Sequence, residues 1–511
     1  VQNMSKILLT SFFLSSWMIA AIELDKQLTI RDVEYLGKYQ TESNTFIFRG
    51  IPYAEPPINN LRWKSPIPAK KNLKIDARQF KPACMQDRYN TDWYHNVIKA
   101  FGSDPSLFDH VNSISEDCLY LNIWTKSLET SARKPVMVWI HGGNDTAGWS
   151  YEPDYIGHNL SNKDVVVVSI GYRLNIFGFF RHPNMIKQTG NFGLEDQILS
   201  LQWLKENIEY FGGDPKNITI FGESAGGAHI SYHLASPASE GLFEKAIIQS
   251  GGYNLISPYS LLDIQDAHSL AKEATDIISP NNFEALRKID SNKLLDASKA
   301  MGYPFHPIID GNLIQKEILN IYSSENLNKV DLIIGSNKNE EYLYIDKELS
   351  IEDLIKQITE RNPGKADKIV SLLDLSDIPL ASDRVGTNQL TACPSIFIAR
   401  QMTKSGNKVY QYLFSKQRVN SGIILSYHGA EIPYVFGTHD LYLPTTNKDQ
   451  KLTASMMNYW TQFAKTGNPN SEDTDVFWSE FGDDENYIIL DTTIKTDQKL
   501  ERELCDLIFT N

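Results

Sequence analysis

The stretch TIFGESAGG at residues 219–227 decides the fold of this chain. It contains the pattern G-x-S-x-G, which by itself occurs by chance in roughly one chain in ten of this length. The context makes it more specific, because the residues before Ser224 read as a short buried strand and those after it as a helix. A sharp turn between the two would expose the serine hydroxyl at the positive end of the helix. Side chains at Gly222 and Gly226 would collide with the neighbouring strand or helix, so the turn needs both glycines.

Apolar runs of strand length recur along the chain, with helical stretches between them. They are rich in valine and isoleucine and have few alternating polar positions, which is typical of strands buried on both faces. The amphipathic stretch Leu194–Ile208 fits a helix that covers such a sheet. The pattern predicts an α/β fold with a large, mostly parallel central sheet and helices on both faces. The expected strands are Pro135–Ile140, Val165–Ile170, Ile218–Phe221, Lys245–Gln249, Asp331–Ile334 and Val409–Phe414.

The composition is that of a large globular protein. The chain has 511 residues, of which 41% are hydrophobic, so it can form a sizeable core. It contains no linker-like tract and no internal repeat, and residues 22–511 are therefore expected to form one domain. The net charge of −14 would repel phosphates, which argues against a nucleic-acid partner. The same charge favours solubility and would also attract cationic ligands into a cleft.

Residues 1–21 have the pattern of a signal peptide. Lys6 precedes an apolar run that is short for a membrane span and ends in small residues near Ala20 and Ala21. Met4 fits the start of translation, which leaves residues 1–3 as upstream read-through. The alternative is a signal anchor. No second apolar run of spanning length follows, and no retention or lipid-anchor signal ends the chain, so we expect a secreted protein.

The cysteine count fits an oxidising compartment. Cys84, Cys118, Cys393 and Cys505 allow three disulfide pairings, of which one joins sequence neighbours. No cysteine lies at ligand spacing from another cysteine or a histidine, so we expect no metal site. The sequons at Asn159 and Asn217 are candidate glycosylation sites.

Four further blocks are long enough to be specific. They are FRGIPYAEPP at 48–57, SEDCLYLNIW at 115–124, GNFGLEDQ at 190–197, and FGGDP at 211–215, which leads into the serine turn. With that turn they resemble the type-B carboxylesterase and cholinesterase family of the α/β-hydrolase fold. The resemblance extends from about residue 25 to residue 505. It implies a serine esterase that acts on a small-molecule ester, with no cofactor.

A serine nucleophile needs a base, and the base needs an orienting acid. In this fold the three follow in the order serine, acid, histidine. Glu340 stands in GSNKNE at 335–340, which resembles the acid loop of the family, although Glu341 replaces the glycine that usually follows. Glu341 carries the same charge and is therefore a rival candidate for the acid, but Glu340 is the residue at the acid position of the family loop. His428 stands in SYHGAEIPYVFG at 426–437, which resembles the histidine block of the family. Ser224, Glu340 and His428 are the expected catalytic residues.

The expected oxyanion hole has one unusual residue. The resemblance places one backbone donor at Ala225 and two in the turn HGGND at 141–145, at Gly143 and Asn144. The family usually has glycine where Asn144 stands. Asparagine keeps the N–H and tolerates positive φ, but its side chain enters the space for the substrate carbonyl. Asn144 leaves three consequences open: slower acyl transfer, a narrower substrate range, or a second polar donor in the oxyanion hole.

Two residues are expected in the pocket. Glu223 lines its floor by resemblance, with a purely structural role as the alternative. A cholinesterase would carry a tryptophan in the loop before SEDC, where the register places Phe108, while Trp93 lies in the same loop off register. We therefore favour an uncharged ester of moderate size over choline. The resemblance also predicts the scaffold pairs Arg62–Glu116 and Arg173–Asp196.

The predicted function is a secreted serine carboxylesterase that works through an acyl-serine intermediate. One alternative is a cholinesterase-like enzyme. Another is a catalytically impaired adhesion or binding protein on the same fold, which Asn144 alone favours. The sequence does not indicate the oligomeric state.

Overall fold

The computed structural model describes residues 22–70, 74–109, 111, 113–252, 261–279, 282–324, 327–420, 422, 424–440 and 442–509. The expected signal peptide at residues 1–21 lies outside the described residues. Within the described residues, no helix combines the length and the apolar character needed to cross a membrane.

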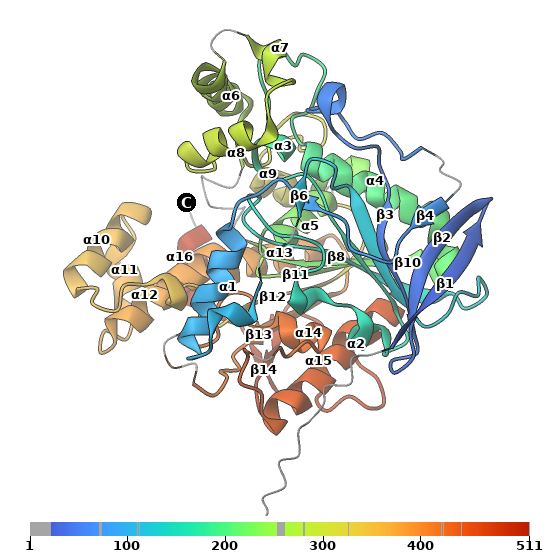
Figure 1. Cartoon of the computed structure of the whole chain (residues 1–511). Coiled ribbons are helices and arrows are strands. Elements are labelled where there is room, and N and C mark those ends of the chain that lie inside the picture. The colour runs from blue at the N-terminus through green and yellow to red at the C-terminus, as the bar shows by residue number, and fades with distance from the viewer. Residues whose placement is uncertain are drawn as a thin grey trace, which may run out of the picture.

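A sheet of 13 strands runs through the molecule in the order β1-β2-β3-β7-β9-β8-β10-β11-β12-β13-β14-β15, with β4 paired to β2 (Figure 1). From β9 to β14 all neighbours are parallel, whereas β1, β2, β3 and β7 pair antiparallel at one end and β15 at the other. The strands are β1 Glu23–Ile30, β2 Val33–Gln40, β3 Thr45–Pro52, β4 Lys74–Asp76, β7 Tyr120–Thr125, β8 Lys134–Ile140, β9 Val166–Ile170, β10 Gly213–Glu223, β11 Lys245–Gln249, β12 Asp331–Asn337, β13 Val409–Phe414, β14 Asn486–Leu490 and β15 Lys495–Gln498. Ala83–Cys84 (β5) and Ile114–Ser115 (β6) form a separate pair.

The central strands are buried on both faces because their alternating side chains enter two different cores. In β8, Val136, Val138 and Ile140 belong to one apolar cluster, and Met137 and Trp139 belong to the other. Successive side chains of a strand point to opposite faces, so neither face of this strand is left for solvent. This explains the runs of valine and isoleucine without polar alternation.

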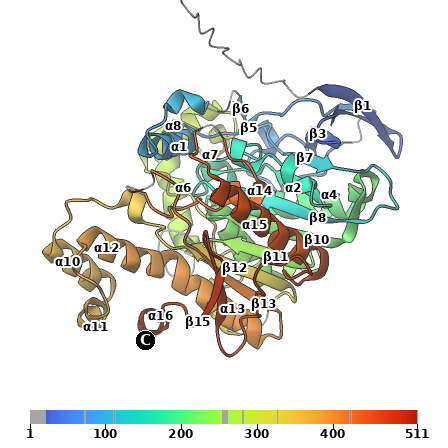
Figure 2. The same cartoon turned by 90° about the horizontal axis from the view of Figure 1, so that it is seen from below.

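Helices complete the two layers (Figures 1 and 2). Residues of α4, α5 and α13 belong to the first apolar cluster, and residues of α1, α14 and α15 belong to the second. Helices α10, α11 and α12 project to one side of the sheet (Figure 1) and have a small cluster of their own with Leu504. The helices are α1 Tyr89–Ala100, α2 His158–Ser161, α3 Asn175–Gly178, α4 Phe192–Asn207, α5 Ala225–Ala235, α6 Ile264–Ile278, α7 Phe283–Leu286, α8 Ser291–Ala300, α9 Ile318–Ser323, α10 Ile351–Arg361, α11 Ala366–Ser371, α12 Ile378–Thr387, α13 Cys393–Lys404, α14 Ile432–Phe436, α15 Asn447–Thr466 and α16 Arg502–Phe509.

The predicted fold class is confirmed. Each of the six expected strands is present in the parallel part of the sheet, as β8 to β13, and the expected helix at 194–208 is α4. The antiparallel strands at the ends of the sheet were not predicted. Strand β1, for example, is largely exposed, and its mixed polar and apolar sequence has no buried run to mark it.

Disulfides and ion pairs join distant segments. Cys84 is bonded to Cys118, and Cys393 is bonded to Cys505, so the structure has the pairing between sequence neighbours. Arg62 binds both carboxylate oxygens of Glu116, as the resemblance predicted. The other predicted pair, between Arg173 and Asp196, is also formed.

Candidate active site

Ser224 lies on a strained turn between the end of β10 and the start of α5. Its backbone has φ 54° and ψ −126°, a conformation that costs about 1–3 kcal/mol for a residue with a side chain. Close backbone contacts enforce the turn. A Cβ at Gly222 would lie 2.5 Å from the Ile140 carbonyl oxygen, and one at Gly226 would lie 2.0 Å from the same atom. The steric need for both glycines, inferred from the sequence, is therefore present in the structure.

His428 and Glu340 stand in line with the serine. The Nε2 atom of His428 is 2.8 Å from Ser224 Oγ, and its Nδ1 is 2.6 Å from Glu340 Oε2. The serine and the histidine are 204 residues apart in the sequence. They meet because β10, β12 and β13 are parallel, so the loops after them leave the same edge of the sheet.

The Glu340 carboxylate is fixed by two other hydrogen bonds. Its Oε1 accepts from Ser250 Oγ at 2.6 Å and from the Asn337 amide at 2.6 Å, and its side chain is fully buried. Glu341, the rival by charge, lines the cavity instead and has its amide bonded to Asp383. The sequence contained no signal for Ser250 or Asn337.

The turn at 141–145 passes directly beside the serine. A Cβ at Gly142 would lie 2.9 Å from Ser224 Cβ. Gly143 and Asn144 have φ values of 111° and 56° and line the same cavity as Ser224. Within the part of the chain that the structure describes, neither amide donates to another protein group. Ala225 begins α5, and the first amides of a helix have no acceptor inside it. These three amides are thus available to a ligand at the serine.

A second carboxyl group borders the histidine. Glu223 Oε1 lies 3.2 Å from His428 Nε2. Burial raises the pKa of Glu223 to about 8, although His428 opposes this rise. Burial alone would lower the pKa of His428, but the charges of Glu223 and Glu340 outweigh it and raise that pKa to about 10. Protonation of Glu223 would remove one of the negative charges that raise the His428 pKa, so the charge state of each group affects the other.

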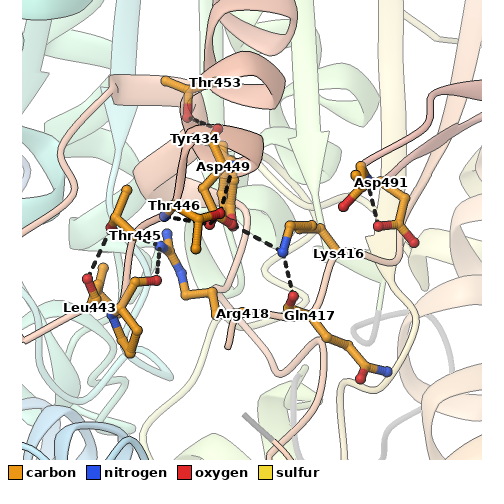
Figure 3. A network of polar contacts seen from close by, with 12 residues as sticks. Lys416, Gln417, Arg418, Tyr434, Leu443, Thr445, Thr446, Asp449, Thr453 and Asp491 are labelled. Atoms are coloured by element: carbon orange, nitrogen blue, oxygen red, sulfur yellow. Dashed lines mark hydrogen bonds and ion pairs between the residues drawn. The ribbon is translucent and has the colours of Figure 1, made fainter. Parts of the chain in front are cut away.

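A buried ion pair joins the start of the segment that carries His428 to α15, and Figure 3 shows this pair with its polar neighbours. Lys416 Nζ lies 3.1 Å from Asp449 Oδ1, and both side chains are almost completely buried. Asp449 also accepts a hydrogen bond from Tyr434 at 2.6 Å and forms a capping box with Thr446 at the start of α15. Arg418 lies over the Tyr434 ring, 4.6 Å from its centre. These contacts hold both ends of the segment around His428 against α15.

The serine opens into a cavity of about 300 Å³. Its wall is strongly aromatic and acidic. The aromatic residues are Tyr89, Trp93, Tyr94, Tyr155, Tyr344, Tyr427 and Tyr442, and the acidic residues are Glu152, Asp154, Glu223 and Glu341. A cavity of this size suits a small or medium ester, and its carboxyl groups offer hydrogen-bonding partners to the polar atoms of such a ligand.

The expected pocket position of Phe108 is wrong. Phe108 is buried, and its ring stacks on Tyr94 at 4.0 Å, behind the wall of the cavity. Trp93 from α1 lines the cavity instead, with its indole N–H bonded to the Tyr344 hydroxyl at 2.8 Å. The pocket residue was placed by counting positions in the loop before SEDC. This count selects Phe108 instead of Trp93, because α1 coils the loop between Cys84 and Cys118. Trp93 is the one tryptophan in that loop, which was a usable signal.

The asparagines of the two sequons are partly buried, and each uses its amide nitrogen. Asn159 donates to the Gly437 carbonyl at 2.7 Å, and Asn217 donates to the Lys465 carbonyl at 3.2 Å. Glycosylation at either residue stays a prediction, and it would require these bonds to open.

A mostly parallel sheet that presents a serine on a strand-to-helix turn, beside a histidine and a buried carboxylate, defines an α/β-hydrolase. Comparisons with known proteins agree. The model of the carboxylesterase family matches residues 26–508. The chain therefore belongs to the carboxylesterase family and is a carboxylic ester hydrolase.

The relatives include both esterases and cholinesterases. The chain is 33% identical to a medium-chain fatty acyl-CoA hydrolase precursor of Anas platyrhynchos, over 90% of this chain and 87% of the relative. It is 31% identical to an acetylcholinesterase of Electrophorus electricus (96% and 89% covered) and 30% identical to carboxylesterase 1E of Rattus norvegicus (92% and 90% covered).

Proposed function

We propose that this protein is a secreted serine carboxylesterase that cleaves esters through an acyl-Ser224 intermediate. One observation carries the proposal: His428 contacts Ser224 through Nε2 at 2.8 Å and Glu340 through Nδ1 at 2.6 Å. This arrangement activates a hydroxyl that is otherwise a poor nucleophile. The two disulfides suit an oxidising compartment and support the secreted location.

The proposed reaction has two halves. Ser224 Oγ attacks the ester carbonyl while His428 Nε2 takes up the hydroxyl proton, and the imidazolium then gives this proton to the leaving alcohol. Water next attacks the acyl-serine, with His428 again as base, and releases the acid. Glu340 holds the imidazole and stabilises its positive charge. Gly143, Asn144 and Ala225 donate their amides to the negative oxygen that forms in both halves.

Reporter esters test this proposal directly. We expect the protein secreted from a eukaryotic host to hydrolyse p-nitrophenyl acetate and butyrate. A fluorophosphonate should block turnover with one equivalent bound, and peptide mass spectrometry should recover it on Ser224. A folded, disulfide-bonded preparation that shows neither turnover nor labelling would instead support the binding-protein alternative.

The pH dependence should reveal the role of Glu223. His428 must be neutral to act as a base, so kcat/KM falls on the acidic side as His428 becomes protonated. The charge of Glu223 raises the His428 pKa. Glu223→Gln should therefore lower that pKa and move the acid limb of kcat/KM about one pH unit or more toward lower pH. Profiles of kcat/KM between pH 5 and 11 measure this shift, with the exposed Asp92→Asn as control. An unchanged or upward-shifted limb would contradict it.

The position of Trp93 favours a second candidate, hydrolysis of a cationic ester. A Cβ at Gly429, next to the histidine, would lie 3.5 Å from the Trp93 ring and 3.6 Å from Glu223 Oε1. An aromatic face and a carboxyl group at one place suit a quaternary ammonium group. Under this alternative, tetramethylammonium competes with p-nitrophenyl acetate, and Trp93→Ala weakens the inhibition about tenfold or more. Phe108→Ala is the matched control from the same loop. Equal inhibition of the wild-type and Trp93→Ala enzymes would exclude this candidate.

A further inference from the structure

Asp145 is a buried carboxylate directly behind the proposed oxyanion hole. It follows Asn144 in the chain and is 4% exposed. Gly143, Asn144 and Asp145 have φ values of 111°, 56° and 58°. Two consecutive residues with side chains in the left-handed region are costly, and the surrounding structure must hold them there.

Three contacts hold Asp145. Its Oδ1 lies 2.7 Å from His229 Nε2, its Oδ2 lies 3.0 Å from His306 Nδ1, and its carbonyl oxygen accepts from the backbone N–H of Asn175 at 2.6 Å. Burial alone would raise the pKa of Asp145, but the two histidines lower it to about 2. The carboxylate is therefore ionised at neutral pH and accepts a hydrogen bond on each oxygen.

His229 connects this turn to the other wall of the hole. It lies on α5, four residues after Ala225, and therefore on the same face of that helix. Because His229 Nε2 donates to Asp145, its Nδ1 is free to accept, and Gln197 Nε2 lies 2.7 Å from it. Gln197 Oε1 lies 2.8 Å from His233 Nε2, and His233 Nδ1 lies 2.9 Å from Ser239 Oγ. Each group in this buried chain has a partner, so the His229 ring is fixed in orientation.

We infer that Asp145 and His229 are positioning residues for the oxyanion hole: their hydrogen bond fixes the turn that carries Gly143 and Asn144 relative to the helix that carries Ala225. The inference rests on the proposed function, because the hole matters only if Ser224 attacks a carbonyl. An amide displaced by a fraction of an ångström stabilises a developing charge less well, while binding of the neutral ester changes little. Neither residue lines the cavity at Ser224.

The test compares His229→Leu, which removes the donor, with His229→Gln, whose side-chain N–H can replace Nε2–H. Active-site titration with a fluorophosphonate counts the functional serines, so that inactive, misfolded protein does not lower the kcat value. For His229→Leu we expect kcat on p-nitrophenyl acetate to fall about 10- to 100-fold with KM changed less than threefold. The inhibition constant of a trifluoromethyl ketone, which places an oxyanion in the hole, should rise by a similar factor. His229→Gln should recover most of both losses.

Asp145→Asn is the second variant and should show the same loss of kcat and of ketone affinity. His182→Leu, at a buried histidine that stacks on Phe283, is the control and should change neither. Unchanged ketone affinity in His229→Leu and Asp145→Asn would overturn the inference while the esterase proposal stands. A wild-type protein that neither turns over esters nor reacts with the phosphonate would overturn both.

Discussion

Replacement of Ser224 by alanine should lower kcat for p-nitrophenyl esters by about 10⁵- to 10⁶-fold. The variant keeps the cavity and the three amides, but no group remains that can form the acyl intermediate. The remaining rate would come from water attacking a carbonyl that the amides still polarise. Initial rates at high enzyme concentration measure the loss. The fluorophosphonate should no longer label the protein.

The control for this variant is Ser231→Ala on the same helix. Ser231 Oγ donates to the Ala228 carbonyl and lies inside α5, so its loss should leave turnover within about threefold. Turnover by Ser224→Ala above about one hundredth of the wild-type rate would contradict the proposed mechanism. In that case the reacting group would have to be sought elsewhere in the cavity.

The largest effect on stability is expected from Arg173→Met. Arg173 binds both oxygens of Asp196, at 2.8 and 2.7 Å, and donates to the Lys64 carbonyl at 2.8 Å. The side chains are 3% and 0% exposed. Burial already raises the pKa of Asp196, and Arg173 opposes this rise. Without the guanidinium the carboxylate is left uncompensated, which should lower the free energy of unfolding by about 3–5 kcal/mol.

Urea unfolding followed by tryptophan fluorescence measures this loss. The double variant Arg173→Met with Asp196→Asn should recover part of it, because the buried charge is then removed. Lys38→Met, from an exposed pair with Asp25, should cost at most about 1 kcal/mol. A loss of the same small size for Arg173→Met would mean that Asp196 is accommodated by protonation or by water.

The sequence predicted those parts of the molecule that depend on local patterns. The central strands were predictable because burial on both faces leaves runs of valine and isoleucine, and the Ser224 turn because close packing requires glycine. The counted register missed the exchange of Phe108 for Trp93, because α1 coils the loop between Cys84 and Cys118, although Trp93 as the one tryptophan of that loop was a usable signal. The contacts of Asp145 were also hidden. His229 and His306 lie 84 and 161 residues away from it in the sequence, and no local motif marks such pairs.

The proposed triad and a large part of the cavity wall come from different parts of the chain. Ser224, Glu340 and His428 follow sheet strands, whereas Tyr89, Trp93 and other wall residues come from α1, within the segment that the Cys84–Cys118 bond closes. A change in this closed segment therefore alters the wall of the cavity without moving the strands that position the proposed triad. For the same reason the segment is a natural unit for loop grafting and directed evolution.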